Sequence, residues 1–116
     1  MITIDQIESF CLKKELTSEA FPFDNSTLVF KVLGKVFAVC PLEAWESGSP
    51  SITLKCDPIY AVELRNSYDF IRPGFHTNKK HWNTVYLNNA GFSPEFIFKL
   101  IDHSYSMVVQ NMPKKL

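Results

Sequence analysis

Apolar residues repeat at helical spacing near both ends of the chain, whereas apolar and polar residues alternate in its middle. Thr3 and Gln6 have the spacing of a capping box, and the apolar stripe after them predicts a helix over residues 4–15. Ser93, which precedes a proline, predicts the start of a second long helix that we expect to end at Pro113. The stripe expected on this second helix consists of Ile97, Leu100, Ile101, Ser104, Val108 and Asn111.

The alternating middle of the chain predicts a set of short strands. Gly34 lies between two runs rich in β-branched and aromatic residues, which is typical of a hairpin because glycine readily adopts the positive φ of a tight turn. Asp57, followed by a proline, predicts the start of a short helix that continues to about Asn66. The five expected strands cover residues 28–32, 35–40, 51–56, 70–72 and 82–87.

The order of the expected elements is α-β-β-β-α-β-β-α, which indicates an α+β fold. Short strands joined mainly by hairpins and single helices favour a two-layer α/β sandwich, in which a five-stranded antiparallel sheet carries the helices on one face. The other face is expected to be more polar or to form a binding surface. Residues 16–27 and 42–50 are expected to be irregular, and residues 88–91 to form a turn. A length of 116 residues predicts a single domain over residues 1–116.

The charge of the chain is balanced but unevenly distributed. Twelve basic and twelve acidic residues cancel, which argues against a generic nucleic-acid coat protein because such proteins are usually strongly basic. Residues 1–24 contain five acidic residues against two lysines, whereas residues 65–82 contain four basic residues against Asp69 alone. The basic character is therefore concentrated in one segment of the chain.

Cysteine usage and hydropathy indicate the compartment. Cys11, Cys40 and Cys56 lack the spacing of a metal site and have apolar neighbours, so we expect buried thiols in a reducing compartment. The first residues do not form a secretory signal, and no segment approaches the ~20 apolar residues of a membrane span. We therefore expect a soluble, cytoplasmic protein without a membrane partner.

Residues 68–85 combine cations, amides, histidines and aromatic rings more densely than the rest of the chain. Lysine and arginine can contact phosphates and asparagine or histidine can reach base edges, so this loop can act as a wing against DNA. Asn78 can instead satisfy loop backbone groups, and Lys79 and Lys80 can be no more than a solvated face. We expect Trp82 to pack in the core. The candidate nucleic-acid-binding residues are Arg72, His76, Asn78, Lys79, Lys80 and His81.

The chain offers little for metal or covalent chemistry. His76 and His81 are five residues apart, which is not a known zinc spacing, and His103 lies in the last expected helix. Cys56 and Ser104 do not lie in a recognisable nucleophile elbow. We therefore expect no metal, no cofactor and no enzymatic activity.

The segment PGFHTNKKHWNTV, residues 73–85, resembles the MmcQ/YjbR family of small bacterial proteins, whose pattern is close to PGYHMNKRHWNTV. Phe75 replaces the tyrosine of that pattern and Lys80 its arginine. The resemblance implies a CyaY-like fold, also compared with secretion chaperones, and a double-wing DNA-binding function. The frataxin-like fold comparison also suggests iron bound on acidic ridges. We do not expect iron binding here, because Asp5 and Glu8 are the only close acidic pair on the first expected helix. The resemblance extends to residues 29–32, 34–35, 54–58, 64–65 and 103–105.

Three functional hypotheses follow. The first is a non-enzymatic DNA-binding protein that uses the basic loop, and the second is a protein-interaction module that uses the open face of the sheet. The third is an enzyme in which His76 and His81 act as acid and base. Salt separates the first two, because phosphate contacts weaken steeply with salt and a hydrophobic protein interface does not. Replacing Lys79 and Lys80 by alanine is expected to reduce salt dependence and to leave the melting temperature nearly unchanged.

Overall fold

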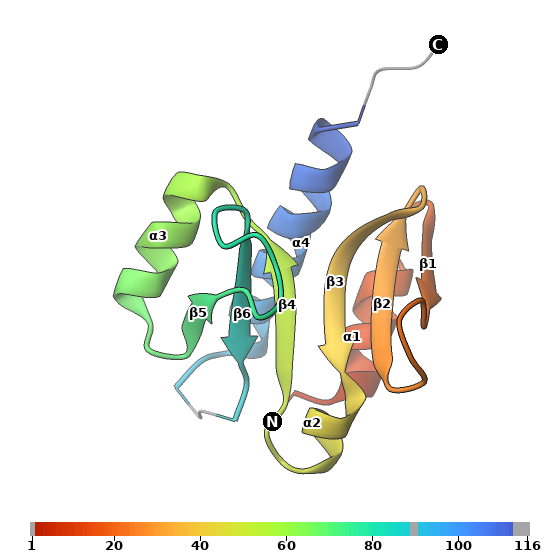
Figure 1. Ribbon diagram of the computed structural model, residues 1–116, viewed down its shortest axis with the longest axis horizontal. Coiled ribbons are helices and arrows are strands. Elements are labelled where there is room, and N and C mark those ends of the chain that lie inside the picture. Colours follow the sequence, from red (N-terminus) through yellow and green to blue (C-terminus); the bar gives the residue numbers. More distant parts are fainter. Residues whose placement is uncertain (1, 89–90, 113–116) are drawn as a thin grey trace.

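The computed structural model describes residues 2–88 and 91–112 and contains a six-stranded antiparallel sheet with helices. The strand order across the sheet is β1-β2-β3-β4-β6-β5 (Figure 1). Pro113, the expected end of the last helix, and part of the expected turn at residues 88–91 lie outside the described residues. The elements are α1 (Ile4–Leu12), β1 (Thr17–Ala20), β2 (Thr27–Val32), β3 (Lys35–Pro41), α2 (Leu42–Glu46), β4 (Ser51–Lys55), α3 (Pro58–Ser67), β5 (Ile71–Pro73), β6 (Trp82–Tyr86) and α4 (Pro94–Gln110).

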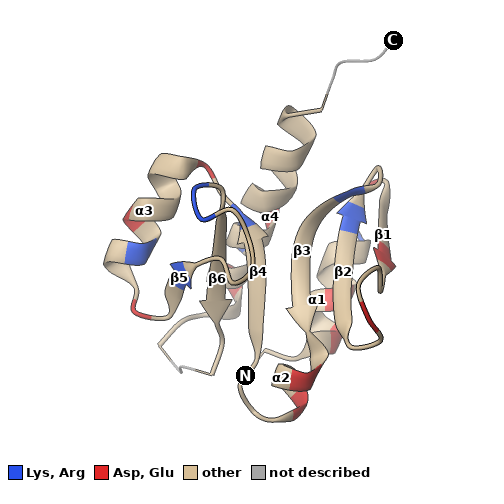
Figure 2. Cartoon of the chain, viewed as in Figure 1, with Lys and Arg blue, Asp and Glu red and all other residues tan. Residues whose placement is uncertain are grey.

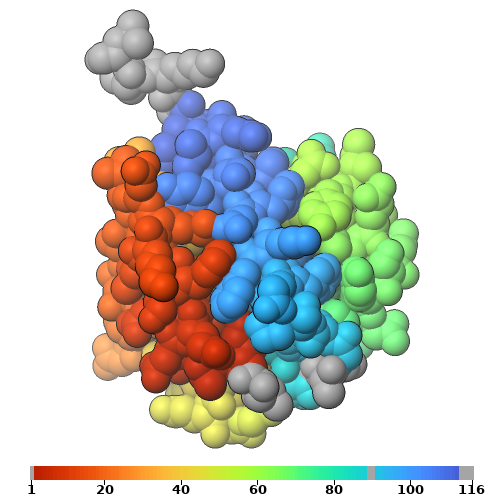
Figure 3. All heavy atoms as spheres, turned by 180° about the vertical axis from the view of Figure 1, so that it is seen from behind, coloured from red at the N-terminus to blue at the C-terminus, as the bar shows by residue number. Residues whose placement is uncertain are grey.

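Helices α1 and α4 lie behind the sheet in Figure 1, and α3 lies beside its β5 edge; the reverse view of Figure 3 shows α4 between the other two. The core lies between these helices and the sheet, where Ile7 of α1, Phe30 of β2, Ile52 of β4 and Ile101 of α4 are fully buried. Burial of such apolar surface is the main favourable contribution to folding. The expected α+β fold with an antiparallel sheet is confirmed. No helix in the described part of the chain is long and apolar enough to cross a membrane.

The sheet has six strands rather than the expected five, because Thr17–Ala20 form β1 within a stretch expected to be irregular. β1 pairs with β2 from Thr17↔Val32 to Ala20↔Val29 and lies at the edge of the sheet. None of the four residues of β1 is fully buried, so the strand does not need apolar side chains on one face. Its sequence, TSEA, accordingly lacks the apolar alternation by which a strand is predicted. Main-chain hydrogen bonds to β2 hold this strand, and those bonds leave no pattern in the side chains.

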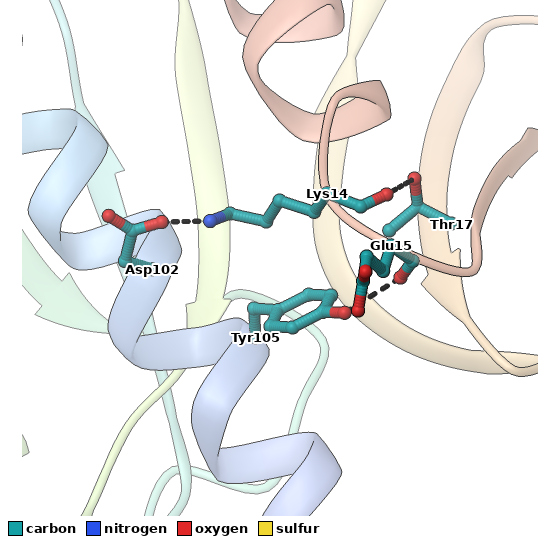
Figure 4. A network of polar contacts seen from close by, with 5 residues as sticks. All are labelled: Lys14, Glu15, Thr17, Asp102 and Tyr105. Atoms are coloured by element: carbon teal, nitrogen blue, oxygen red, sulfur yellow. Dashed lines mark hydrogen bonds and ion pairs between the residues drawn. The ribbon is translucent and has the colours of Figure 1, made fainter.

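Side chains of α4 fasten the segment that leads into β1 (Figure 4). Lys14 forms an ion pair with Asp102, and the Tyr105 hydroxyl donates to the Glu15 carbonyl at 2.7 Å. The Thr17 hydroxyl donates to the Lys14 carbonyl at 2.8 Å, which closes the turn between α1 and β1. These contacts direct the chain from α1 to the edge of β2, which explains why β1 forms from a weakly predictive sequence.

Residues 42–50 contain a second unexpected element, the short helix α2, where we expect only a loop. Trp45 on this helix is half-buried against the core, and its indole N–H donates to the Ser51 carbonyl at 2.9 Å. This tryptophan therefore joins α2 to the start of β4.

The local signals at helix starts and at the β2–β3 turn are confirmed, whereas α1 ends at Leu12 rather than at the expected residue 15. Thr3 and Gln6 form the capping box of α1, and the Asp57 and Ser93 side chains cap α3 and α4. Gly34 has a φ of 83° in the β2–β3 turn, as expected for a tight hairpin. All residues of the expected α4 stripe except Asn111, which is the C-cap, are buried.

A hydroxyl of α4 separates β3 from β4 at one end of the sheet. The Ser104 hydroxyl donates to the Phe37 carbonyl of β3 at 2.6 Å and accepts from the Lys55 N–H of β4 at 2.8 Å. The two strands pair only at Ala38↔Leu54 and Val39↔Thr53. Ser104 thus supplies the hydrogen bonds that the two strands do not exchange at this end, which is the end that carries Lys55.

Candidate functional site

The alternation of side chains along β6 distinguishes the two faces of the sheet. Asn83 and Val85 point toward the helices, since the Asn83 amide donates to the Ala61 carbonyl of α3 and Val85 belongs to the core. Their neighbours in the strand, Trp82 and Thr84, must point the opposite way. We call the side of the sheet opposite the helices the open face.

Three cations project from the strands onto the open face: Lys31 from β2, Lys55 from β4 and Arg72 from β5. Only β3 lies between β2 and β4, although the Ser104 hydroxyl separates β3 from β4 at the end that carries Lys55. Asp and Glu are absent from the described strand residues of this face. These residues are Ser18, Ala20, Thr27, Val29, Lys31, Val36, Val39, Pro41, Ser51, Thr53, Lys55, Arg72, Trp82, Thr84 and Tyr86.

The distribution of charge in the whole molecule agrees with that inventory. Figure 2 shows blue segments on the β5–β6 loop, on β5 and near the β2–β3 turn. Red segments lie on α1, α2 and β1, and also on α3 and at its two ends. Acidic residues therefore also occur on the helix to which the loop is fastened, whereas the charged strand residues of the open face are cations.

The first part of the β5–β6 loop lies against the open face. The Gly74 N–H donates to the Trp82 carbonyl at 2.9 Å, and the Phe75 N–H donates to the Thr84 hydroxyl at 3.0 Å. The Thr84 hydroxyl also pairs with the Thr53 hydroxyl of β4 at 2.7 Å. A Cβ on residue 74 would lie 2.1 Å from the Thr77 hydroxyl oxygen and 2.8 Å from the Trp82 Cβ, so only glycine permits this approach.

The second part of the loop is fastened to β4 and α3. The Cys56 N–H donates to the His81 carbonyl at 2.8 Å, and the Arg65 guanidinium of α3 donates to the Lys79 carbonyl at 3.0 Å. The Asn78 side-chain oxygen accepts from the Lys80 N–H at 2.9 Å. Asn78 therefore has the backbone-satisfying role that the sequence left open.

The predicted site residues are gathered around one loop, but they differ in how free their polar groups are. Arg72, Lys79 and Lys80 are exposed, but Arg72 Nε donates to the Asp69 carbonyl at 3.4 Å and the Lys79 ammonium donates to the Gly74 carbonyl within the loop. His76 is exposed with a φ of 58°, and its ring lies 3.9 Å from that of Phe75. His81 is half-buried. Their assignment to nucleic acid remains a prediction.

Trp82 does not lie in the core, so that expectation is wrong. Trp82 is the first residue of β6, as expected, and pairs with Lys55 of β4. Its half-buried side chain, however, lies on the open face rather than in the core. The core reached by β6 is instead lined by Val85, which is 1% exposed. A tryptophan next to a Pro-Gly turn is compatible with either face, and only the register of β6 decides which one it joins.

Lys31 and Lys55 are the site residues that sequence reasoning missed. Each directly follows a buried residue of a strand, Phe30 and Leu54 respectively, so alternation alone assigns both lysines to the face opposite the core. That signal was present in the sequence. What the sequence did not contain is the strand order, which brings both lysines to the side of the sheet against which the loop lies.

The cysteines are not poised for reaction. Burial raises the pKa of the Cys11 and Cys56 thiols to about 12, and it raises the pKa of the Cys40 thiol well above its ordinary value. A thiolate is the reactive form of cysteine, so these three side chains behave as small apolar core residues. No cluster of three or more His, Cys, Asp or Glu side chains suited to a metal ion occurs within residues 2–88 and 91–112.

The segment His103–Tyr105 has a structural role, although it is part of the family resemblance. His103 Nε2 accepts from the Asp57 N–H at 3.1 Å, which secures the start of α3. Burial lowers the pKa of His103, and the Asp57 carboxylate partly opposes that shift. The next two residues, Ser104 and Tyr105, bind the strands and the α1–β1 segment as described above. All three side chains are therefore occupied within the fold.

Comparisons with known proteins agree on one family. Residues 12–107 match the family model YjbR. The chain is 32% identical over 114 residues to YjbR of Escherichia coli (strain K12), a match that covers 98% of this chain and 93% of the relative. It is 37% identical over 95 residues to YbdF of Escherichia coli O157:H7, covering 82% of this chain and 75% of the relative.

Two solved structures share the fold. The crystal structure of Deinococcus radiodurans protein DR2400, with a DUF419 domain, matches with a TM-score of 0.87 and 36% identity over 99% of this chain and 84% of that chain. A crystal structure of a protein from Pseudomonas syringae matches with a TM-score of 0.76 and 27% identity over 91% of this chain and 98% of that chain. The names of these relatives state no activity. The protein belongs to the YjbR family.

Proposed function

We propose that this protein binds nucleic acid through the open face of its sheet, with the β5–β6 loop as part of the same surface. The observation that carries the proposal is the charge of that face: Lys31, Lys55 and Arg72 project from three strands, and the described strand residues beside them include no acid. Exposed Lys80 adds a fourth cation from the loop. The proposal involves no chemical step.

The proposed mode of binding is electrostatic and local. Because the chain as a whole is neutral, attraction to phosphate must come from this patch rather than from net charge. About four phosphate contacts predict a slope of log K against log salt of roughly −3 on a single strand and −3.5 on a duplex, and non-specific binding of this kind has a Kd of ~10⁻⁴–10⁻⁶ M. Such binding is weak and salt-sensitive, in contrast to a hydrophobic protein interface.

The test compares two pairs of lysines by fluorescence anisotropy with a labelled DNA oligonucleotide at several salt concentrations. Lys31→Ala with Lys55→Ala removes two cations from the open face, and the slope is expected to fall by about 1.5–2 units. Lys13→Ala with Lys99→Ala removes two exposed cations on the helical side, one at the C-cap of α1 and one in α4, and the slope is expected to stay unchanged. Both double variants change the net charge equally.

Two results would overturn the proposal. In one, wild-type protein binds no DNA and no RNA even at low salt, and the cationic face then fits an acidic protein partner better. In the other, the two double variants lose affinity equally, which would mean that net charge matters and the open face does not.

A further inference from the structure

Aromatic side chains share the open face with the cations. Trp82 and Tyr86 project from β6 on this face, both half-buried, and Trp82 lies opposite Lys55. The loop adds Phe75, whose side chain is 65% exposed although its N–H donates to the Thr84 hydroxyl of β6 on the same face. The open face thus combines flat apolar rings with cations at neighbouring positions.

The two tryptophans of the chain show that Trp82 is free for an external contact. The Trp45 indole donates to a backbone carbonyl, and its ring packs against the core. The Trp82 indole donates to no group among residues 2–88 and 91–112, and the ring is not part of the core cluster. A buried tryptophan normally finds a partner for its N–H, so Trp45 has a structural role and Trp82 remains available.

Phe75 is held in place rather than loosely exposed. Its backbone is anchored to Thr84, its ring lies against His76, and the positive φ of His76 turns the loop immediately after it. Gly74 brings this part of the loop against Trp82. A large apolar ring fixed in water next to cations and a second aromatic ring is suited to stacking on a flat ligand.

We propose, on the basis of the nucleic-acid binding proposed above, that the preferred ligand is a single-stranded polynucleotide whose bases stack on Phe75 and Trp82. Its phosphates lie toward Lys55, Lys31 and Lys80. In a duplex the bases are already stacked and paired and offer no free face to these rings, whereas the splayed bases of a single strand do. Flat antiparallel sheet faces with exposed aromatics and flanking cations recognise single strands in this way.

A hollow in the same surface offers room for a further nucleotide. A depression of ≈ 510 Å³ lies where β5 and β6 meet the open face. Arg72 of β5 and Tyr86 of β6 both line it, so a polynucleotide that crosses Trp82 can continue toward Tyr86. The lining residues are Asp69, Phe70, Arg72, Tyr86 and Asn88.

The first test measures tryptophan fluorescence during titration with oligothymidylate of about 12 nucleotides, a length within the site sizes of single-strand-binding domains. Wild-type protein and the Trp45→Phe variant are expected to be quenched, because Trp82 contacts the bases in both. The Trp82→Phe variant keeps a ring at the site but is expected to show little quenching. Binding that leaves the emission of the Trp45→Phe variant unchanged would overturn the inference.

The second test compares two exposed phenylalanines by anisotropy. Phe75→Ala is expected to weaken binding of the single strand roughly tenfold without changing the salt slope, because stacking carries no charge. Phe23→Ala, on the β1–β2 connection, removes a ring that is 70% exposed and is expected to leave the affinity unchanged. Equal effects of the two changes would overturn the inference. Thermal melting monitored by circular dichroism checks that both variants fold.

Three ligands separate failure of this inference from failure of the proposed function. Oligothymidylate, oligouridylate and a DNA duplex of equal length are compared at one salt concentration. At least tenfold tighter binding of either single strand supports the inference, and the ratio of the two single strands shows which sugar is preferred. Equal or tighter binding of the duplex overturns the single-strand inference and leaves nucleic-acid binding intact. Binding of none of the three overturns both.

Discussion

The two faces of the sheet use the same strands for opposite purposes. On the helical face, Phe30 and Leu54 are buried in the core. On the open face, the residues that directly follow them, Lys31 and Lys55, are cations. The core and the surface proposed for binding are therefore separated by a single step along the strand, because successive side chains of a strand point to opposite faces.

This separation has an energetic counterpart. Burying a large apolar side chain contributes ~1.5–3 kcal/mol, whereas a solvated cation contributes little to folding. Changes on the helical face are accordingly expected to lower stability and to spare binding. Changes on the open face are expected to do the reverse. The following predictions test that division in order of decreasing effect.

The largest effect is expected for the neighbouring residues Phe30 and Lys31. Phe30→Ala removes a fully buried ring and is expected to lower the free energy of unfolding by ~3–5 kcal/mol. Lys31→Ala is expected to change it by less than ~0.5 kcal/mol. Urea unfolding followed by circular dichroism measures both values. Comparable losses for the two variants would show that the faces are not energetically separate.

The next effect concerns Ser104, whose hydroxyl joins α4 to both β3 and β4. Ser104→Ala leaves the Phe37 carbonyl and the Lys55 N–H without that partner and is expected to cost ~1–3 kcal/mol. Ser106→Ala, an exposed change on the same helix, serves as the control and is expected to be nearly neutral. Equal stabilities of the two variants in urea would contradict the role assigned to Ser104.

Gly74 allows the loop to approach Trp82 closely, so its replacement is expected to affect both stability and the proposed binding. In Gly74→Ala the new methyl group collides with the Thr77 hydroxyl and the Trp82 Cβ. Overpacking of this kind costs ~1–3 kcal/mol, and relief requires the loop to move away from Trp82. We expect a lower melting temperature together with weaker oligonucleotide binding. A variant that melts like wild type would show that the close approach is not required.

A smaller effect is expected from pH. Because the pKa of His103 is lowered in the folded state, the unfolded chain takes up this proton first as the pH falls below the ordinary value of 6.5. The contribution of His103 to stability is therefore complete above that pH and is lost as the pH falls toward its folded pKa. His103→Gln keeps an acceptor for the Asp57 N–H but cannot titrate. Urea unfolding is expected to show that the free energy of unfolding declines less steeply from neutral to mildly acidic pH in this variant than in the wild type. Identical declines would show that His103 does not contribute to the pH dependence of stability.

The smallest effect distinguishes two adjacent lysines of the loop. Lys80→Ala is expected to reduce the salt slope of DNA binding by ~0.7–0.9 units, because its ammonium is free to meet a phosphate. Lys79→Ala is expected to reduce it less, because the Lys79 ammonium already donates to the Gly74 carbonyl. Both changes are expected to alter stability by no more than ~0.5 kcal/mol. Equal slopes for the two variants would mean that the contact of Lys79 with Gly74 opens when DNA binds.

Much of the fold was accessible from the sequence because its signals are local. The caps at Thr3, Asp57 and Ser93 and the turn at Gly34 each involve residues within a few positions of one another. The α4 stripe repeats at the period of the helix itself. The loop at residues 73–85 also stood out by composition and motif, and the match of the chain to the YjbR family confirms that resemblance.

Features made by contacts between distant segments were not accessible in this way. β1 forms because the main chain of β2 pairs with it and Tyr105 of α4 holds the preceding segment in place. Neither contact can be predicted from the sequence TSEA. The register of β6 placed Trp82 on the open face, and the fold engaged the Lys79 ammonium within the loop. The sequence by itself separated Lys31 and Lys55 from the buried residues that precede them, since that depends only on a period of two. Tertiary structure alone decided which strands are neighbours, and so brought Lys31, Lys55 and the loop onto one surface.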